Sequence, residues 1–165
     1  MDNGVSRREL LKASVIGATV AMGGIATAHA GETTDVRIGN SVKSADWKKE
    51  KHVPLIEIPQ MIKAGEPFIV TMTVGKDIPH PNTTEHFIGW IALYFKPESG
   101  AFITQLGKYE FSAHGESSLG ANKGSSYADP CAMAKVKLNT SGTLTAVSYC
   151  NIHGLWESSI PVTVA

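Results

Sequence analysis

The strongest constraint on the fold is a period of two in hydrophobicity, with almost no helical period after residue 31. Successive side chains of a β-strand point to opposite faces of the sheet, so alternating apolar residues predict a strand with one buried face. The clearest case is residues 68–74, in which the apolar positions are Phe68, Val70, Met72 and Val74. We therefore expect an all-β fold.

Further segments rich in β-branched and aromatic residues follow, separated by turn-forming residues. They are residues 87–95, 101–111, 132–138, 143–149 and 158–164. Short strands in succession are typical of an antiparallel β-sandwich. Residues 114–126 are rich in Gly and Ser, so we expect a mobile surface loop there.

The first thirty residues have the features of an export signal. Arg7 and Arg8 precede an almost uncharged apolar stretch over residues 13–28, which contains glycines and is short for a membrane span of about 20 residues. We predict a twin-arginine signal peptide over residues 1–30, cleaved on export, and one mature domain over residues 31–165. The expected location is the periplasm, with no membrane attachment after cleavage.

The charge balance limits the partners. The chain has 15 Lys plus Arg and 15 Asp plus Glu. A near-neutral composition gives no support for nucleic acid or an anionic membrane surface as partner. Any attraction for an anion must therefore be local.

Four histidines and a cysteine in the strings EKHVP, HPNTTEH and YCNIHG are candidate metal ligands. Each lies at a predicted strand end or in a loop, where side chains from different strands can converge without interrupting the sheet. Imidazole and thiolate groups bind late first-row transition metals well. The candidates are His52, His80, His86, Cys150 and His153.

The number of candidate donors favours a redox centre. Structural zinc normally takes four ligands, whereas five leave one open position of a six-coordinate metal for a small molecule. Iron suits the set, because imidazoles hold it and a thiolate opposite the open position donates electron density. We expect the backbone N–H groups of Ile152 and His153 to hydrogen-bond the sulfur of Cys150.

The strings EKHVP, HPNTTEHFIGWIALYF and SYCNIHGLWE resemble the superoxide reductase family, which includes neelaredoxin and the catalytic domain of desulfoferrodoxin. The resemblance implies one iron, Fe2+ or Fe3+, held equatorially by four histidines and axially by one cysteine. On this sequence those roles fall on His52, His80, His86, His153 and Cys150. No CxxC pair precedes them, so the chain resembles the one-iron type, and we predict an immunoglobulin-like antiparallel β-sandwich.

The resemblance also implies a reaction. Superoxide is reduced by one electron to hydrogen peroxide at the open sixth site, and no oxygen is formed. Glu50 and Lys51 correspond to the family's mobile glutamate and lysine: the carboxylate can occupy the sixth site in the ferric state, and the ammonium attracts superoxide and stabilises bound peroxide. A cation beside the iron would supply the local field that the overall composition lacks.

The expected partners are superoxide and a one-electron donor. A rubredoxin serves cytoplasmic relatives, and a periplasmic enzyme would use a cytochrome or another carrier. Family members of this type are often homotetramers, a state that the sequence neither shows nor excludes.

Two other functions fit parts of the sequence. A cupredoxin-like electron-transfer protein is also a β-sandwich with an upstream histidine and a late Cys followed by His. However, no Met follows His153 as the weak axial ligand, and three upstream histidines exceed the one required. An adhesive or carrier module with incidental histidines is the second alternative, and it would contain no stoichiometric iron or copper.

Cys131 has two interpretations. In an exported protein it could form a disulfide with Cys150, which would remove the axial ligand. We favour a free thiol packed near Pro130. His29 and His114 have no partner at ligand spacing and are left out of the ligand set.

Overall fold

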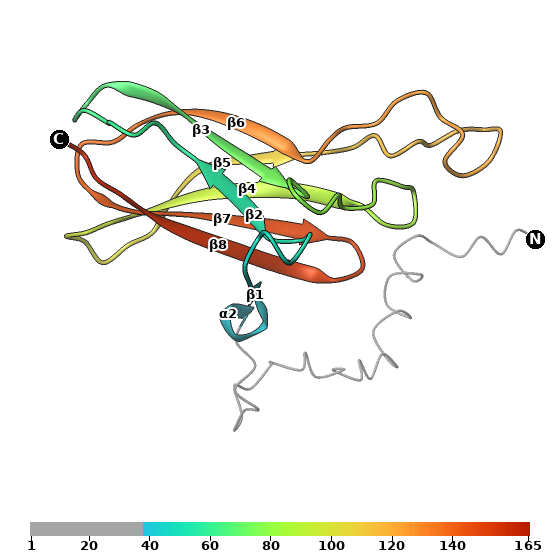
Figure 1. The fold of residues 1–165 in the computed structure, drawn as a ribbon, viewed down its shortest axis with the longest axis horizontal. Helices are drawn as coiled ribbons and strands as arrows, with labels where there is room; N and C mark the ends of the chain where they lie inside the picture. Colours follow the sequence, from blue (N-terminus) through green and yellow to red (C-terminus); the bar gives the residue numbers. More distant parts are fainter. Residues whose placement is uncertain (1–37) are drawn as a thin grey trace, which may run out of the picture. The chain divides into compact units, whose positions relative to one another are not determined.

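The computed structural model describes residues 38–165, which form two β-sheets (Figure 1). The elements are α2 (Ile38–Ser41), β1 (Lys43–Ser44), β2 (Pro54–Glu57), β3 (Pro67–Val74), β4 (Ile88–Pro97), β5 (Thr104–Glu110), β6 (Cys131–Lys137), β7 (Gly142–Cys150) and β8 (Gly154–Val162). The predicted signal peptide lies outside the described residues. No helix within residues 38–165 has the length and hydropathy needed to span a bilayer.

The two sheets have the strand orders β1-β8-β7-β4-β5 and β2-β3-β6. All pairs are antiparallel except β1 with β8, which are parallel. Apart from the two-residue β1, the order β2-β3-β6 against β8-β7-β4-β5 is that of an immunoglobulin-like sandwich. The predicted all-β fold is therefore confirmed.

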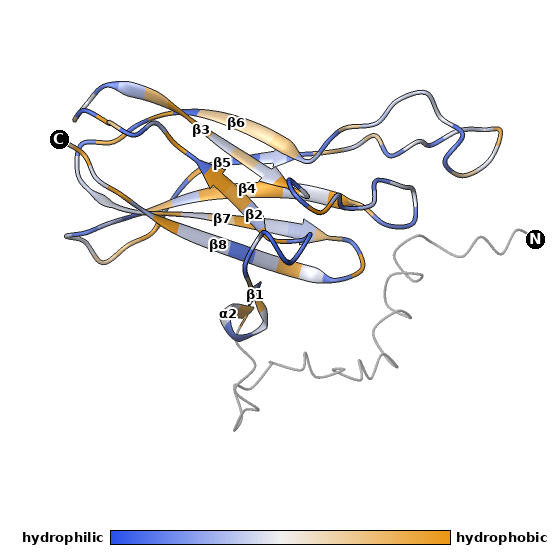
Figure 2. Cartoon of the chain, viewed as in Figure 1, coloured by the Kyte–Doolittle hydropathy of each residue, from blue (hydrophilic) through white to orange (hydrophobic). Residues whose placement is uncertain are grey.

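Alternating apolar side chains build the core between the sheets. In β3, Val70 and Met72 are fully buried, and β6 buries every second residue in the same way. They pack in one cluster with buried residues of the other sheet such as Ile91, Leu93 and Leu144. Figure 2 shows the corresponding apolar bands on strands of both sheets, for example on β2 and β4.

The strand boundaries depart from the sequence prediction where pairing, and not hydrophobicity, decides them. Strand β2 was not predicted, because four residues are too few to show a clear alternation of apolar and polar side chains. Strand β8 begins at Gly154, not at residue 158, because Gly154 already pairs with Cys150, the last residue of β7. Strand β5 begins at Thr104, and Phe102 before it is exposed.

Candidate metal centre

All five predicted ligands lie on loops or strand ends. His52 precedes β2, and His80 and His86 lie in the β3–β4 loop (residues 75–87). Cys150 is the last residue of β7, and His153 lies in the turn to β8. Gly154 closes that turn with a φ of 76°, a conformation that glycine adopts without steric cost.

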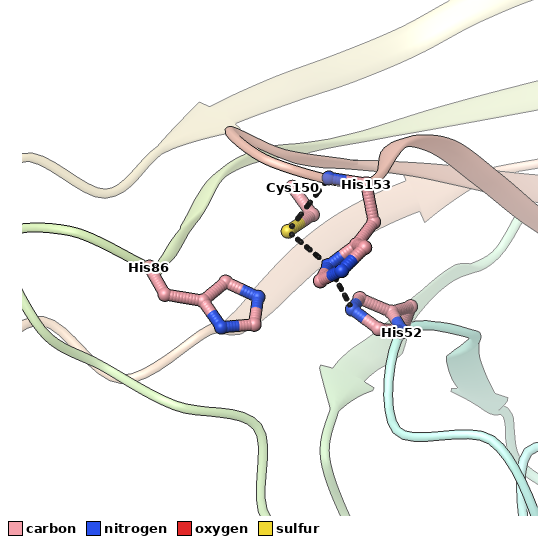
Figure 3. A group of neighbouring side chains, drawn as sticks. All are labelled: His52, His86, Cys150 and His153. Atoms are coloured by element: carbon pink, nitrogen blue, oxygen red, sulfur yellow. Dashed lines mark hydrogen bonds between the residues drawn. The ribbon is translucent and has the colours of Figure 1, made fainter.

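Four of these side chains form a compact cluster, in which they point toward one another (Figure 3). The ligand atoms of His52, His86, Cys150 and His153 all lie within 4.8 Å of one another. The His80 ring adjoins them, with its centroid 4.8 Å from that of His52 and 4.6 Å from that of His86. The fold therefore brings together all five residues that the sequence nominated.

Two imidazole nitrogens in this cluster are buried without a hydrogen-bond partner among the described residues. They are Nε2 of His80 and Nε2 of His86. The Nδ1–H of His80 donates to the carbonyl oxygen of Pro81 at 2.7 Å, so its Nε2 carries the lone pair. Buried polar atoms without partners are rare and costly, and a metal ion is the partner that these lone pairs fit.

His52 is oriented in the same way. Its Nδ1–H donates to Oε1 of Glu50 at 2.6 Å, and a carboxylate on one imidazole nitrogen fixes the tautomer that leaves the other free for a metal. In this tautomer Nε2 is an acceptor, and it lies at hydrogen-bond distance, 3.0 Å, from Nδ1 of His153. The Glu50 carboxylate thus contacts the ring nitrogen that faces away from the cluster.

The sulfur of Cys150 completes the donor set. The side chain is fully buried, and both cysteines are free thiols, so the disulfide alternative is wrong. The backbone N–H of His153 donates to Sγ at 3.4 Å, as predicted, whereas the predicted bond from the Ile152 N–H is not found among the described residues. Nδ1 of His153 lies 3.5 Å from Sγ. A thiolate stabilised in this way is a suitable ligand for a late first-row metal.

Comparison with known proteins identifies relatives of this chain. Residues 44–159 match the model of the Desulfoferrodoxin family. The chain is 51% identical to neelaredoxin from Megalodesulfovibrio gigas over 122 residues, covering 74% of this chain and 94% of that protein. It is also 51% identical to superoxide reductase from Pyrococcus furiosus over 123 residues, covering 74% and 97%.

The chain belongs to the desulfoferrodoxin family. Among solved structures, superoxide reductase (neelaredoxin) from Archaeoglobus fulgidus in the reduced form superimposes with a TM-score of 0.70 at 50% identity, covering 74% of this chain and 98% of that one. The family match over residues 44–159 includes the whole cluster, from His52 to His153, so the candidate metal site lies within the part of the chain that matches the family.

The surroundings favour the neutral form of three of the candidate ligands. Burial lowers the pKa of His52 and of His86, and it lowers the pKa of His80 to about 4. The positive charge of Lys51 acts in the same direction on all three rings. Neutral imidazole is the form that binds metals.

Two further side chains lie around the centre. Trp156, three residues after His153 in the sequence, stacks on the His52 ring with the centroids 4.9 Å apart and the planes at 14°. His114, which we had left in a surface loop, is 3% exposed and stacks on Phe87, the residue after His86. Nothing in the sequence indicated this contact, because Phe87 is far from His114 along the chain.

Proposed function

We propose that this protein is a one-iron superoxide reductase. His52, His80, His86 and His153 would hold the iron through imidazole nitrogens, and Cys150 would hold it through sulfur. The observation that carries the proposal is the convergence of these five donors, two of which have a buried nitrogen without a partner among the described residues. The family match and the relatives named superoxide reductase support the same activity.

The chemistry supplied by the metal is one electron, given by Fe2+ to superoxide, which takes up two protons to become hydrogen peroxide. The protein groups have separate tasks. The Cys150 thiolate donates electron density to the metal, and its hydrogen bond from the His153 N–H moderates that donation. Lys51 attracts the anionic substrate through its local positive charge.

The role proposed for Glu50 requires a movement. The resemblance gives this carboxylate the sixth metal site in the ferric state, whereas here it accepts hydrogen bonds from Nδ1 of His52 at 2.6 Å and from the His52 backbone N–H at 3.3 Å. To reach the metal it must leave the His52 ring. Glu50 therefore has two competing positions, of which this structure shows one.

The cupredoxin-like alternative is not favoured. A blue-copper site needs one upstream histidine, whereas three converge here with the late Cys and His. The family match gives no support to copper. Iron is the metal consistent with both findings.

Metal analysis and rapid kinetics test the proposed function together. We expect one iron per chain, and in stopped-flow mixing with superoxide we expect the reduced protein to be oxidised with one hydrogen peroxide and no oxygen formed. The ferric product should show a sulfur-to-iron absorption band that reduction removes. Stoichiometric copper, or no oxidation by superoxide, would reject the proposal.

We further propose that residues 1–30 direct export through the twin-arginine pathway and that the mature domain works in the periplasm. The motif Arg7-Arg8 before an apolar stretch supports this. Cell fractionation of the wild type and of a variant with both arginines changed to Lys would test it. We expect the variant to stay in the cytoplasm with residues 1–30 still attached.

The electron donor and the assembly state are proposals of the same kind. We propose a small one-electron carrier, a rubredoxin-like protein or a periplasmic cytochrome, as donor, and a homotetramer as the assembly. Reduction of the ferric protein by each purified carrier tests the first. Light scattering of the iron-loaded protein tests the second, and a monomeric mass would reject the tetramer.

A further inference from the structure

The β3–β4 loop carries two of the five ligands but belongs to neither sheet. Its own backbone bonds are the reciprocal pair between Thr83 and His86, each at 3.1 Å. Residues 113–128, called the 113–128 segment here, project from the same end of the sandwich as this loop (Figure 1). Contacts from that segment therefore have a direct effect on where the ligands lie.

The 113–128 segment is itself folded back on its own chain. The Ala128 N–H donates to the Ala113 carbonyl at 2.7 Å, and the Gly115 N–H donates to the Ser126 carbonyl at 3.1 Å. The Gly124 N–H donates to the Gly115 carbonyl at 2.9 Å. Hydrogen bonds of this kind give the segment a defined backbone path, which its Gly- and Ser-rich composition did not predict.

His114 lies where the segment meets the ligand loop. Its ring stacks on Phe87 with the centroids 3.9 Å apart and the planes at 16°. Nδ1 lies 2.7 Å from Oδ1 of Asn82, and Nε2 lies 2.9 Å from the carbonyl oxygen of Phe111. One buried side chain thus connects the ligand loop to the end of β5.

The hydrogen-bond partners of His114 indicate which of its ring nitrogens carry a proton. The Asn82 amide is fixed, because its Nδ2 donates to the Ala128 carbonyl at 3.0 Å and the reversed amide would place two oxygens in contact. Asn82 Oδ1 and the Phe111 carbonyl are both acceptors, so both ring nitrogens of His114 must donate. A ring that donates from both nitrogens is an imidazolium.

The surroundings of His114 suit a positive charge. The face of Phe87 favours a cation stacked on it. The carboxylate of Glu116, whose Oε2 accepts the His114 backbone N–H at 2.7 Å, is the one charged group among the described contacts of His114. That backbone bond and, to a smaller degree, the charge of His114 lower the pKa of Glu116.

Asn122 makes a second contact between the segment and the loop. Its Oδ1 accepts from the backbone N–H of Thr84 at 2.8 Å and from the Thr84 hydroxyl at 3.2 Å. Its Nδ2 donates to Oε2 of Glu85 at 2.8 Å. The residue has a φ of 61°, and its carbonyl accepts the Tyr127 hydroxyl at 3.2 Å, so the backbone is held in the conformation that aims the amide at the loop.

We propose that His114, as an imidazolium, and Asn122 are positioning residues that hold the β3–β4 loop so that His80 and His86 present their Nε2 atoms to one metal. The 113–128 segment contacts four residues of the loop, which lie between His80 and His86 or directly after His86: Asn82, Thr84, Glu85 and Phe87. The inference rests on the proposed metal centre. We infer in addition that the affinity of the site for its metal depends on the 113–128 segment, which contributes no ligand itself. Side chains that are already held in place lose less conformational freedom when the metal binds.

The protonation state is tested without metal. In metal-free protein with 15N-labelled histidine, near neutral pH, we expect two directly bonded N–H pairs in the His114 ring. A single pair would overturn the imidazolium assignment.

The positioning role is tested with His114→Phe, which keeps an aromatic ring on Phe87 but removes both donors, and with Asn122→Gly, which tolerates the positive φ but lacks the amide. We expect amide exchange of residues 82–87 in the metal-free protein to accelerate by about tenfold or more, and Co2+ affinity to fall by about 10- to 100-fold. Val136→Ala, in the core of β6, is the control for general loss of stability. It should leave both quantities unchanged at a comparable loss of Tm.

The outcomes are distinguishable. Unchanged exchange and unchanged Co2+ affinity in both variants would overturn the positioning role, and so would equal effects in Val136→Ala. If His114→Phe does not fold, Asn122→Gly alone decides. A wild-type protein that binds neither Fe2+ nor Co2+ would overturn the proposed function, while the ring spectra and the exchange rates would still decide this inference.

Discussion

The β7–β8 hairpin and the β3–β4 loop each supply two ligands, but they position them by different means. In the hairpin, Cys150 and His153 are three residues apart, and the ladder pairs Cys150 with Gly154, so the backbone places both donors. In the loop, His80 and His86 are placed by side-chain contacts from residues far away in sequence. The candidate metal site therefore combines a half that the backbone ladder positions with a half that depends on surrounding side chains.

Removal of the hairpin sulfur should have the largest effect. We expect Cys150→Ser to lower the rate of superoxide reduction by more than about 100-fold and to abolish the sulfur-to-iron absorption band. The fold should persist, because the hairpin ladder does not need the sulfur. Stopped-flow kinetics, iron analysis and circular dichroism measure these three quantities, and an intact absorption band would show that Cys150 is not a ligand.

Two glycines allow the same substitution in each half. Gly75 and Gly154 have φ values of 80° and 76°, but a Cβ at position 75 would lie 2.6 Å from the backbone nitrogen of His80, whereas one at position 154 would meet nothing within 4 Å. We expect Gly154→Ala to lower the free energy of unfolding by about 1 kcal/mol. We expect Gly75→Ala to lower it by about 3 kcal/mol or more, since backbone must shift.

Urea denaturation and metal titration of the two glycine variants check this difference. Gly75→Ala should also weaken iron binding, because His80 is displaced, and Gly154→Ala should not. Equal effects of the two substitutions would remove the distinction between the hairpin and the loop.

The loop should also make stability depend on pH. Burial lowers the pKa of His80 from 6.5 to about 4, so the unfolded chain takes up a proton at this residue before the folded protein does. Stability of the metal-free protein is therefore complete above about pH 6.5 and should fall by about 3 kcal/mol as the pH drops toward 4. Urea denaturation across this range, with His80→Gln as control, measures it, and identical slopes for both proteins would contradict the assignment.

The smallest effect should come from Lys51, which belongs to neither half. We expect Lys51→Ala to slow association with superoxide by about 3- to 10-fold at low salt and to weaken the salt dependence. Pulse radiolysis measures the rate. Lys137→Ala, at the end of β6 remote from the cluster, removes an equal charge and should have no such effect; unchanged rates in Lys51→Ala would end its role in attracting the substrate.

The fold and the ligands could be predicted because each leaves a local pattern. The alternation in β3 and the string YCNIHG are visible within ten residues, and the structure confirms the buried strand and brings the proposed ligands together. Strand β2 and the parallel pair of β1 with β8 left no such pattern, since they are short and depend on partners elsewhere.

The contacts around the ligands could not be predicted for the same reason. His114 reaches Asn82 across 32 residues, and the Gly- and Ser-rich composition of its segment indicates exposure, not burial. The hydrogen bond from His52 to Glu50 is local in sequence, but it forms only when Nδ1 of His52 carries the proton, and a sequence does not show which ring nitrogen is protonated. Amino-acid composition describes the 113–128 segment as a whole, whereas a single buried side chain in it, His114, makes the contacts to the β3–β4 loop.

The distance in sequence between His52 and His153, whose ring nitrogens meet across 101 residues, has a consequence for the order of assembly. The complete set of donors comes together only when the first described strands and the last have closed into one sandwich. A metal ion bound there would stabilise the folded protein by mass action, to the extent that it prefers the native state over the unfolded chain. The five-donor site is thus a property of the folded chain and of no shorter piece of it.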